Sequence, residues 1–191
     1  MKYNQIMRAP FRASLHFAMP AIAMLTLGCF YALRAEPGED NRGPALPTNC
    51  ASIEVPEGNK VASHVYAVGV QIYRWNGTAW VFVAPSATLY ANADYDGQVG
   101  THYVGPTWES NSGSKVVGAR AAGCTPDPTA IPWLLLQGLT SEGPGVFHRV
   151  TYIQRVNTVG GLAPSTPGST PGEEAQVPYT AEYFFYRAVN N

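Results

Sequence analysis

The sequence has few charged residues and no long amphipathic helical pattern. Only 13% of its 191 residues are charged, and no segment repeats apolar residues at the three-and-four spacing of a surface helix. Two common catalytic patterns are also missing, because the chain has no Gly-x-Ser-x-Gly elbow and no complete Gly-x-Gly-x-x-Gly loop. These absences argue against a helical bundle and give no support to a particular enzyme reaction.

Turn-forming and aromatic residues, in contrast, are abundant. The chain has 19 glycines and 16 prolines, and aromatic residues make up 12% of it. This composition favours many short strands joined by tight turns. A chain of this length suffices for one domain with a sizeable core and is short for two, so we expect a single all-β domain.

The first 35 residues have the layout of a secretory signal. Three basic residues precede an apolar run over residues 17–33, and polarity returns immediately after it. We expect cleavage after Ala35. An uncleaved membrane anchor is the alternative, although Pro20 and the shortness of the run argue against it.

Within the apolar run, the phrase "LTLGC" resembles the end of a lipoprotein signal. Lipid attachment at Cys29 is therefore an alternative to free secretion. In either case we expect a secreted, periplasmic or cell-envelope protein that meets a membrane only through this segment. Residues 36–49 are polar and rich in proline, which predicts a linker before a domain at 50–191.

Removal of the signal would leave an acidic chain with two cysteines. Eight basic and 13 acidic residues would remain, for a net charge of −5. The basic residues are scattered singly, which argues against nucleic acid as a partner. In an oxidising compartment we expect Cys50 and Cys124 to form a disulfide, with two free buried thiols as the alternative.

From residue 61 onward the apolar pattern is that of β-strands. Asn76-Gly77 separates two runs rich in aromatic and β-branched residues and predicts a hairpin with a two-residue turn. In the alternating segment 146–156, we expect Arg149 and Arg155 on the solvated face. Eight to ten strands at this spacing predict an antiparallel β-sandwich or a flattened β-barrel. The further strands are expected at 86–91, 98–104, 115–121, 131–139 and 177–189.

The segment "GTHYVGPTWESNSGSKVVG" is the candidate ligand site. It places polar and aromatic side chains around a Gly-Pro step, in loops that a sandwich would hold at one end. An exposed tryptophan with polar neighbours can stack on a sugar ring or an aromatic ligand. The predicted site for a glycan or small aromatic ligand comprises His102, Tyr103, Trp108, Glu109 and Lys115. The alternative is that the Gly-Pro step turns Trp108 into the core.

Enzyme hypotheses have less support. The histidines that would follow the signal, His64, His102 and His148, lack the close spacing of a metal motif. An extracellular hydrolase or metal-dependent enzyme using His102 and Glu109 remains the alternative to non-enzymatic binding or a structural role. No catalytic residue, metal ligand or cofactor is predicted.

The order of several phrases resembles one protein family. "VPEGNKVA", "GVQIYRW", "VGTHYVGPTWE", "VTYIQRVNTVGGLAP" and "VPYTAEYFFY" follow one another as in domain of unknown function 3455, over residues 46–188. The resemblance implies a secreted all-β domain of bacteria and fungi, with no established reaction or cofactor. The family pattern has cysteines where this chain has Trp75 and either Ser165 or Thr166, so a disulfide at those places would be absent here. Some relatives are labelled dehydrogenases, but "GPGVFH" lacks the third glycine of a dinucleotide-binding loop.

Overall fold

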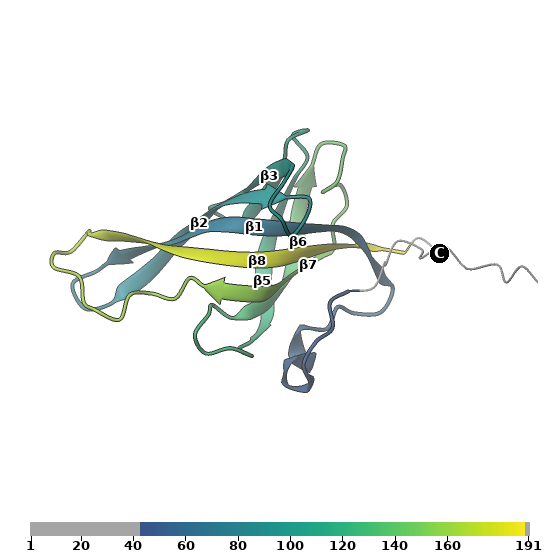
Figure 1. The fold of residues 1–191 in the computed structure, drawn as a ribbon. Coiled ribbons are helices and arrows are strands. Elements are labelled where there is room, and N and C mark those ends of the chain that lie inside the picture. The colour runs from purple at the N-terminus through teal and green to yellow at the C-terminus, as the bar shows by residue number, and fades with distance from the viewer. Residues whose placement is uncertain (1–42, 190–191) are drawn as a thin grey trace, which may run out of the picture. The chain divides into compact units, whose positions relative to one another are not determined.

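The computed structural model describes residues 43–189, which contain an eight-stranded antiparallel β-barrel (Figure 1). Each strand pairs with its neighbours in the sequence, and β8 pairs with β1 to close the barrel. The elements are η1 (Thr48–Ile53), β1 (Asn59–Trp75), β2 (Trp80–Tyr90), β3 (Gln98–Tyr103), β4 (Thr107–Ser110), β5 (Lys115–Cys124), β6 (Trp133–Glu142), β7 (Tyr152–Gly160) and β8 (Glu174–Ala188). The prediction of an antiparallel all-β fold with eight to ten strands is confirmed. The predicted signal and Cys29 lie outside the described residues.

The main core occupies the barrel interior. Side chains alternate between the two faces of each strand, so one face of every strand contributes to this core. Its largest fully buried members are the rings of Trp108, Phe147, Tyr183 and Phe185. Each large aromatic side chain removes roughly 150–250 Å² from water, so these rings supply much of the apolar burial.

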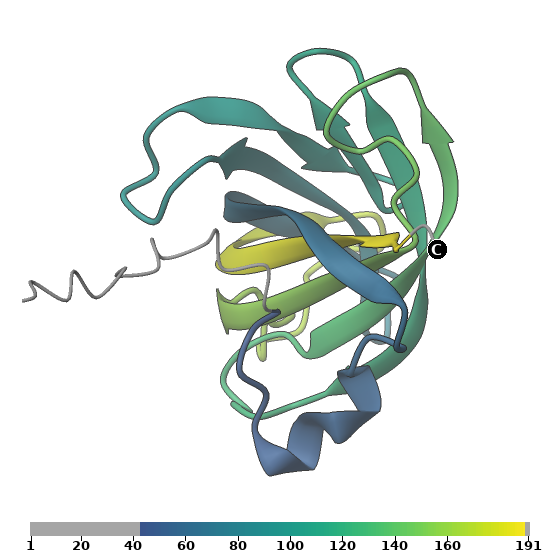
Figure 2. The same ribbon diagram turned by 90° about the vertical axis from the view of Figure 1, so that its right-hand side faces the viewer.

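A second apolar cluster lies outside the barrel wall. η1 packs over β5 and β6, as the two views in Figures 1 and 2 show. Ile53 is fully buried there against residues of β6, β7 and β8, and Leu46 joins the cluster from the segment before η1. Gln154 donates from Nε2 to the Ile53 carbonyl oxygen at 2.7 Å, which satisfies the polar group buried beneath this cover.

The predicted disulfide between Cys50 and Cys124 is present. It joins η1 to the end of β5, with a Cα–Cα distance of 5.4 Å and a sequence separation of 74 residues. Its presence indicates an oxidising environment. Among residues 43–189, no helix is long and apolar enough to cross a membrane.

The hairpin at Asn76 is present, but its loop is longer than predicted. Trp75 pairs directly with Trp80, leaving four residues between the strands instead of two. The Asn76 side-chain Oδ1 accepts hydrogen bonds from the backbone N–H groups of Thr78 and Ala79, and Gly77 takes a φ of +97°. The loop thus satisfies its own backbone donors through the asparagine side chain.

Two other segments differ from the sequence predictions. Residues 107–110, which were expected within a loop, form the short strand β4 between β3 and β5. Residues 146–151 were expected to be extended, but β7 starts only at Tyr152. Arg149 in this loop has a φ of +56°, which is incompatible with a regular strand.

Candidate functional site

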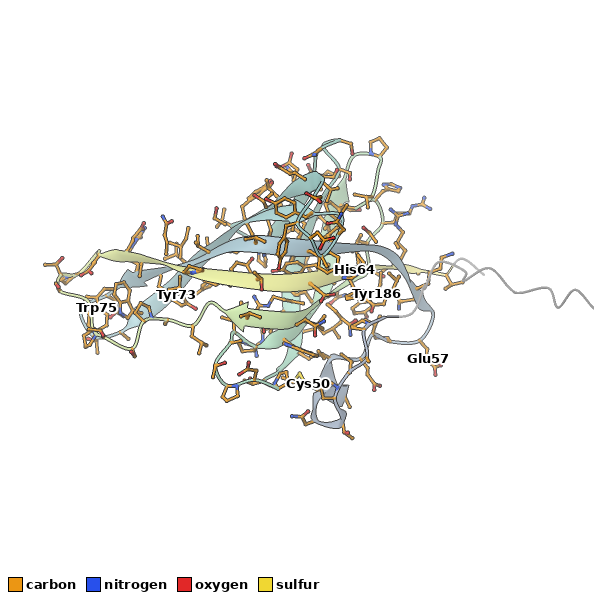
Figure 3. The ribbon with its side chains drawn as sticks, viewed as in Figure 1. Cys50, Glu57, His64, Tyr73, Trp75 and Tyr186 are labelled. Atoms are coloured by element: carbon orange, nitrogen blue, oxygen red, sulfur yellow. A yellow bond between two sulfur atoms is a disulfide. The ribbon has the colours of Figure 1, made fainter. Side chains whose placement is uncertain are left out.

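The barrel interior holds a cavity of about 680 Å³. Interior-facing residues from all eight strands line it, together with the β3–β4 turn and the loop before β6. Tyr73 on β1 belongs to its wall and lies in the half of β1 that ends at Trp75, away from His64 (Figure 3). Small-molecule sites in proteins commonly have volumes of about 300–1,000 Å³, so the cavity has the size of a ligand site.

The cavity is accessible where β2 lacks a partner on one side. β2 pairs with β3 only from Ala87 onward, so residues 80–86 have no strand next to them on the β3 side. Phe82 and Val104 line the cavity and are 50% and 60% exposed. Exposed apolar residues at the rim of an apolar cavity are typical of a ligand entrance.

The walls are predominantly apolar and aromatic. Tyr73 and Phe82 meet edge to face, with ring centroids 5.8 Å apart. Trp108 and Tyr183 also meet edge to face, at 5.4 Å. Leu134, Leu136 and Ile131 complete the apolar wall. These surfaces can hold an apolar or aromatic body by burial and ring contacts.

His102 is buried in the cavity wall and is neutral. The side chain is 3% exposed and stacks on Trp108, with ring centroids 4.3 Å apart. Nδ1 lies 2.8 Å from the Thr107 carbonyl oxygen, which can only accept, so Nδ1 carries the proton. Burial lowers the His102 pKa to about 3, which leaves Nε2 unprotonated at neutral pH.

Two buried N–H groups of the cavity-lining residues have no hydrogen-bond partner of normal geometry among residues 43–189, although Gln71 lies near enough to the Tyr179 hydroxyl to act on its pKa. They are Nε2 of Gln71 and Nε1 of Trp108, in side chains that are 2% and 1% exposed. An unsatisfied buried donor costs roughly 1–3 kcal/mol, and such groups are rare in folded proteins. Their presence beside the cavity indicates that hydrogen-bond acceptors are needed there.

Arg155 on β7 also lines the cavity. Its Nε and Nη2 donate to the Pro132 carbonyl oxygen at 3.2 and 2.8 Å, which fixes the guanidinium against the loop before β6. Its positive charge lowers the pKa of His102, although burial is the larger cause. We expected Arg155 on the solvated face of its strand, and this was wrong: it follows Ile153 on the interior face.

Three of the predicted site residues lie together outside the cavity lining. Tyr103 donates its hydroxyl proton to Glu109 Oε2 at 2.5 Å, and Lys115 Nζ lies 3.6 Å from the same oxygen. The Tyr103 hydrogen bond is the main reason that the Glu109 pKa is lowered, with the Lys115 charge adding to it. The contacts form a network across β3, β4 and β5.

The five predicted site residues therefore do not converge. His102 pairs with Trp108 across β3 and β4 and shares the interior face with it, whereas Tyr103, Glu109 and Lys115 form the separate network. Trp108 is turned into the core, as the alternative prediction held: it is 1% exposed, so the exposed tryptophan that the predicted site required is not found. His102 and Glu109, which the alternative hydrolase or metal hypothesis would use together, lie on opposite faces of the barrel wall. Within the described residues, no three His, Cys, Asp or Glu side chains could hold a metal ion.

Sequence reasoning missed the polar residues of the cavity. Gln71 and Arg155 lie at alternating positions with interior residues, Gln71 two positions before Tyr73 and Arg155 two after Ile153. This spacing was the available signal. A polar residue on the core face of a strand requires an explanation, whereas we assigned Arg155 to the surface because it is charged.

The fold and the cavity define an all-β barrel domain with an internal ligand-sized space. The family model described as "Protein of unknown function (DUF3455)" matches residues 56–187, and the chain belongs to this family. Comparison with curated proteins gave no match, and neither did comparison with solved structures. The two places where the family pattern has cysteines lie near each other here, since Trp75 packs against Gly168 and Trp80 Nε1 donates to the Thr166 carbonyl oxygen at 2.8 Å.

Proposed function

We propose that this barrel is a non-enzymatic binding protein that takes a small, predominantly apolar ligand into its cavity. The observation that carries the proposal is the cavity of about 680 Å³ lined by interior residues of all eight strands. An eight-stranded barrel is just wide enough either to be filled by its own side chains or to hold one small ligand. Trp108, Phe147 and Phe185 fill part of this interior, and the remainder is open.

The wall composition favours an aliphatic or aromatic ligand over a glycan. Sugar hydroxyls each need a hydrogen-bond partner when they leave water. The cavity offers few polar side chains, among them Gln71, His102 and Arg155, and its other residues are mostly leucine, isoleucine, valine, proline and aromatics. We therefore assign the ligand to the small aromatic or aliphatic class.

We also propose that the protein acts outside the cytoplasm. The basic and apolar layout of residues 1–35 supports a secretory signal, and Cys29 is the residue that a lipoprotein signal would modify. The disulfide between Cys50 and Cys124 supports an oxidising compartment. Fractionation of the native host followed by mass spectrometry tests this, and a chain found in the cytosol with Met1 at its N-terminus would contradict it.

Binding of an uncharged apolar fluorophore tests the proposed function. We expect N-phenyl-1-naphthylamine to bind the purified protein with a micromolar dissociation constant and a rise in emission. Leu134→Trp replaces a leucine side chain of the cavity wall by a bulkier indole. It should weaken binding of the fluorophore by at least about tenfold, because the loss of space removes apolar contacts between probe and wall. The matched control is Leu139→Trp on the same strand, since Leu139 is 59% exposed and lies outside the cavity lining.

The outcomes of this experiment are distinct. Equal affinities for wild type and Leu134→Trp, with both proteins folded by near-ultraviolet circular dichroism, would place binding elsewhere and overturn the proposal. Should Leu134→Trp fail to fold, Val104→Trp at the rim provides the second variant, and it too should weaken binding. Absence of any saturable binding to the wild type would leave the barrel as a structural module.

A further inference from the structure

The charged residues of the cavity are all of one sign. Among the described residues that line it, none is Asp or Glu, and the charged ones are Arg120 and Arg155. His102 adds no charge at neutral pH, because its pKa lies near 3. The cavity therefore combines apolar walls with uncompensated positive charge.

Arg155 has donor capacity left for a ligand. Pro132 O takes hydrogen bonds from Nε and Nη2, and the guanidinium also lies beside the Tyr183 hydroxyl, whose pKa it acts to lower against the larger effect of burial. A guanidinium has five N–H donors, so these contacts do not use all of them. No carboxylate of the described chain lies within ion-pair distance of it; the side-chain pairs found there are those of His64, Arg74 and Lys115. The contact with a neutral carbonyl orients the guanidinium without neutralising it.

The other unsatisfied groups are donors as well. Gln71 Nε2 and Trp108 Nε1 lack acceptors in the wall of the same cavity. A ligand that brought only further donors would leave them unpaired, whereas a carboxylate brings two oxygens with about four lone-pair sites. Arginine pairs with carboxylates through charge-assisted hydrogen bonds that are roughly twice as strong as neutral ones.

We propose that the ligand of the cavity is an amphiphilic carboxylate, whose anionic end binds Arg155 and whose apolar body occupies the space between Tyr73, Phe82 and Leu134. This inference rests on the proposed function. It names the ligand class, a monocarboxylic acid with an aliphatic or aromatic body. Arg155 is the specificity-determining residue, and the aromatic walls provide affinity without selecting the end group.

Three ligands with the same body and different end groups test this inference. Decanoic acid, decan-1-ol and decylamine compete with bound N-phenyl-1-naphthylamine at pH 7.5, the acid and the amine below their micellar concentrations and the alcohol below its solubility limit. At this pH the acid is anionic and the amine cationic. We expect the acid to displace the probe at a concentration at least about tenfold lower than the alcohol, and the amine to be the weakest competitor.

Arg155→Met identifies the residue responsible for this preference. Methionine keeps an apolar stem without the charge, so the affinity for the acid should fall at least about tenfold further than the affinities for the alcohol and the uncharged probe. Arg155→Lys should keep part of the preference for the acid over the alcohol. Its ammonium group retains the charge but lacks the planar guanidinium that can bind both carboxylate oxygens. The matched control is Arg74→Met, because Arg74 is exposed and pairs with Glu174 outside the cavity.

Failure of the inference and failure of the proposed function give different results. Equal displacement by acid and alcohol overturns the carboxylate assignment while saturable probe binding upholds the cavity as a site. An acid preference that survives in Arg155→Met overturns the role of Arg155. Lack of probe binding to the wild type removes the proposed function itself.

Discussion

His102 shows how burial changes the chemistry of one residue. In the sequence it belonged, with Glu109, to the alternative hydrolase or metal hypothesis, but in the barrel it is a neutral ring stacked on Trp108. Its Nδ1–H group donates a hydrogen bond to the Thr107 carbonyl oxygen. Protonation of Nε2 would place a second charge close to Arg155, which also acts to lower the His102 pKa.

The burial of His102 predicts a stability that depends on pH. With a pKa of about 3 in the folded chain and about 6.5 in the unfolded chain, the unfolded state binds more protons between these values. Stability is therefore complete above pH 6.5 and falls as the pH is lowered towards 3. A shift of this size corresponds to a loss of stability on the order of 5 kcal/mol on full acidification.

Urea unfolding at several pH values checks this prediction. His102→Asn removes the titrating ring, so its free energy of unfolding should fall less between pH 6.5 and 3 than that of the wild type, although it starts lower. His148→Asn is the matched control, because His148 is exposed in the loop before β7, and its slope should follow the wild type. Parallel slopes for His102→Asn and the wild type would contradict the assignment.

Residue patterns predicted part of the candidate site. The alternation in "THYVGPTWES" predicts that His102 and Tyr103 face opposite sides once their segment is a strand. It does not predict which side is inside, because both faces carry aromatic residues. Arg155 was assigned to solvent on chemical grounds, and only the closed barrel places it beside residues of β1, β5 and β6.

At the scale of elements, η1 is attached to the barrel wall by the disulfide and by buried apolar contacts. It is six residues long, which is far too short to be stable alone. Its buried residues Cys50 and Ile53 form the contact with the barrel wall. The Cys50–Cys124 disulfide is the covalent part of this contact. It also closes a loop in the unfolded chain and so lowers the conformational entropy of the unfolded state.

Removal of the disulfide should lower stability without unfolding the barrel. For a separation of 74 residues, the chain-entropy model gives a loss of about 4 kcal/mol. We expect Cys50→Ser/Cys124→Ser to unfold at a lower urea concentration than the oxidised wild type, with its β-sheet circular dichroism kept before the transition. Wild type unfolded in the presence of a reductant is the control and should match the variant. A change below about 1 kcal/mol would show that the disulfide contributes little to stability.

Strands were predictable where the apolar pattern of their own segment is long enough to identify them. The run "IPWLLLQGL" was correctly predicted as a strand, and β5 and β8 follow their predicted segments closely. β4 was missed because a four-residue strand between two turns has too few positions to establish a pattern. Residues 146–151 alternate as a strand would, but the left-handed backbone at Arg149 ends that pattern.

At the scale of the whole molecule, closure depends on β1, the longest strand. β1 pairs with β2 on one side and with β8 on the other over most of its length. The sequence predicted both a sandwich and a flattened barrel, because alternation along each strand is the same in the two. The pairing of the first strand with the last decides between them, and no local pattern encodes it.

Gly69 permits the close approach of β1 and β2. A Cβ atom at this position would lie 2.1 Å from the Ser86 carbonyl oxygen and 2.5 Å from the Ala87 Cα, both of which belong to the backbone. We expect Gly69→Ala to lower the free energy of unfolding by at least about 2 kcal/mol, because the strands must separate to admit the methyl group. Urea denaturation measures this, and a loss within about 0.5 kcal/mol of zero would show that the backbone adjusts freely.

Because the interior is open, the melting temperature of this domain should depend on the concentration of any ligand that occupies it. A molecule held between the strands binds only the native chain, so at a concentration of 100 times its dissociation constant it would raise the unfolding free energy by about 2.7 kcal/mol. A library of metabolites can therefore be searched by melting temperature alone, with no label and no prior choice of compound. The same linkage means that occupancy would protect the protein from proteases in its surroundings, so that the loaded form outlives the vacant one.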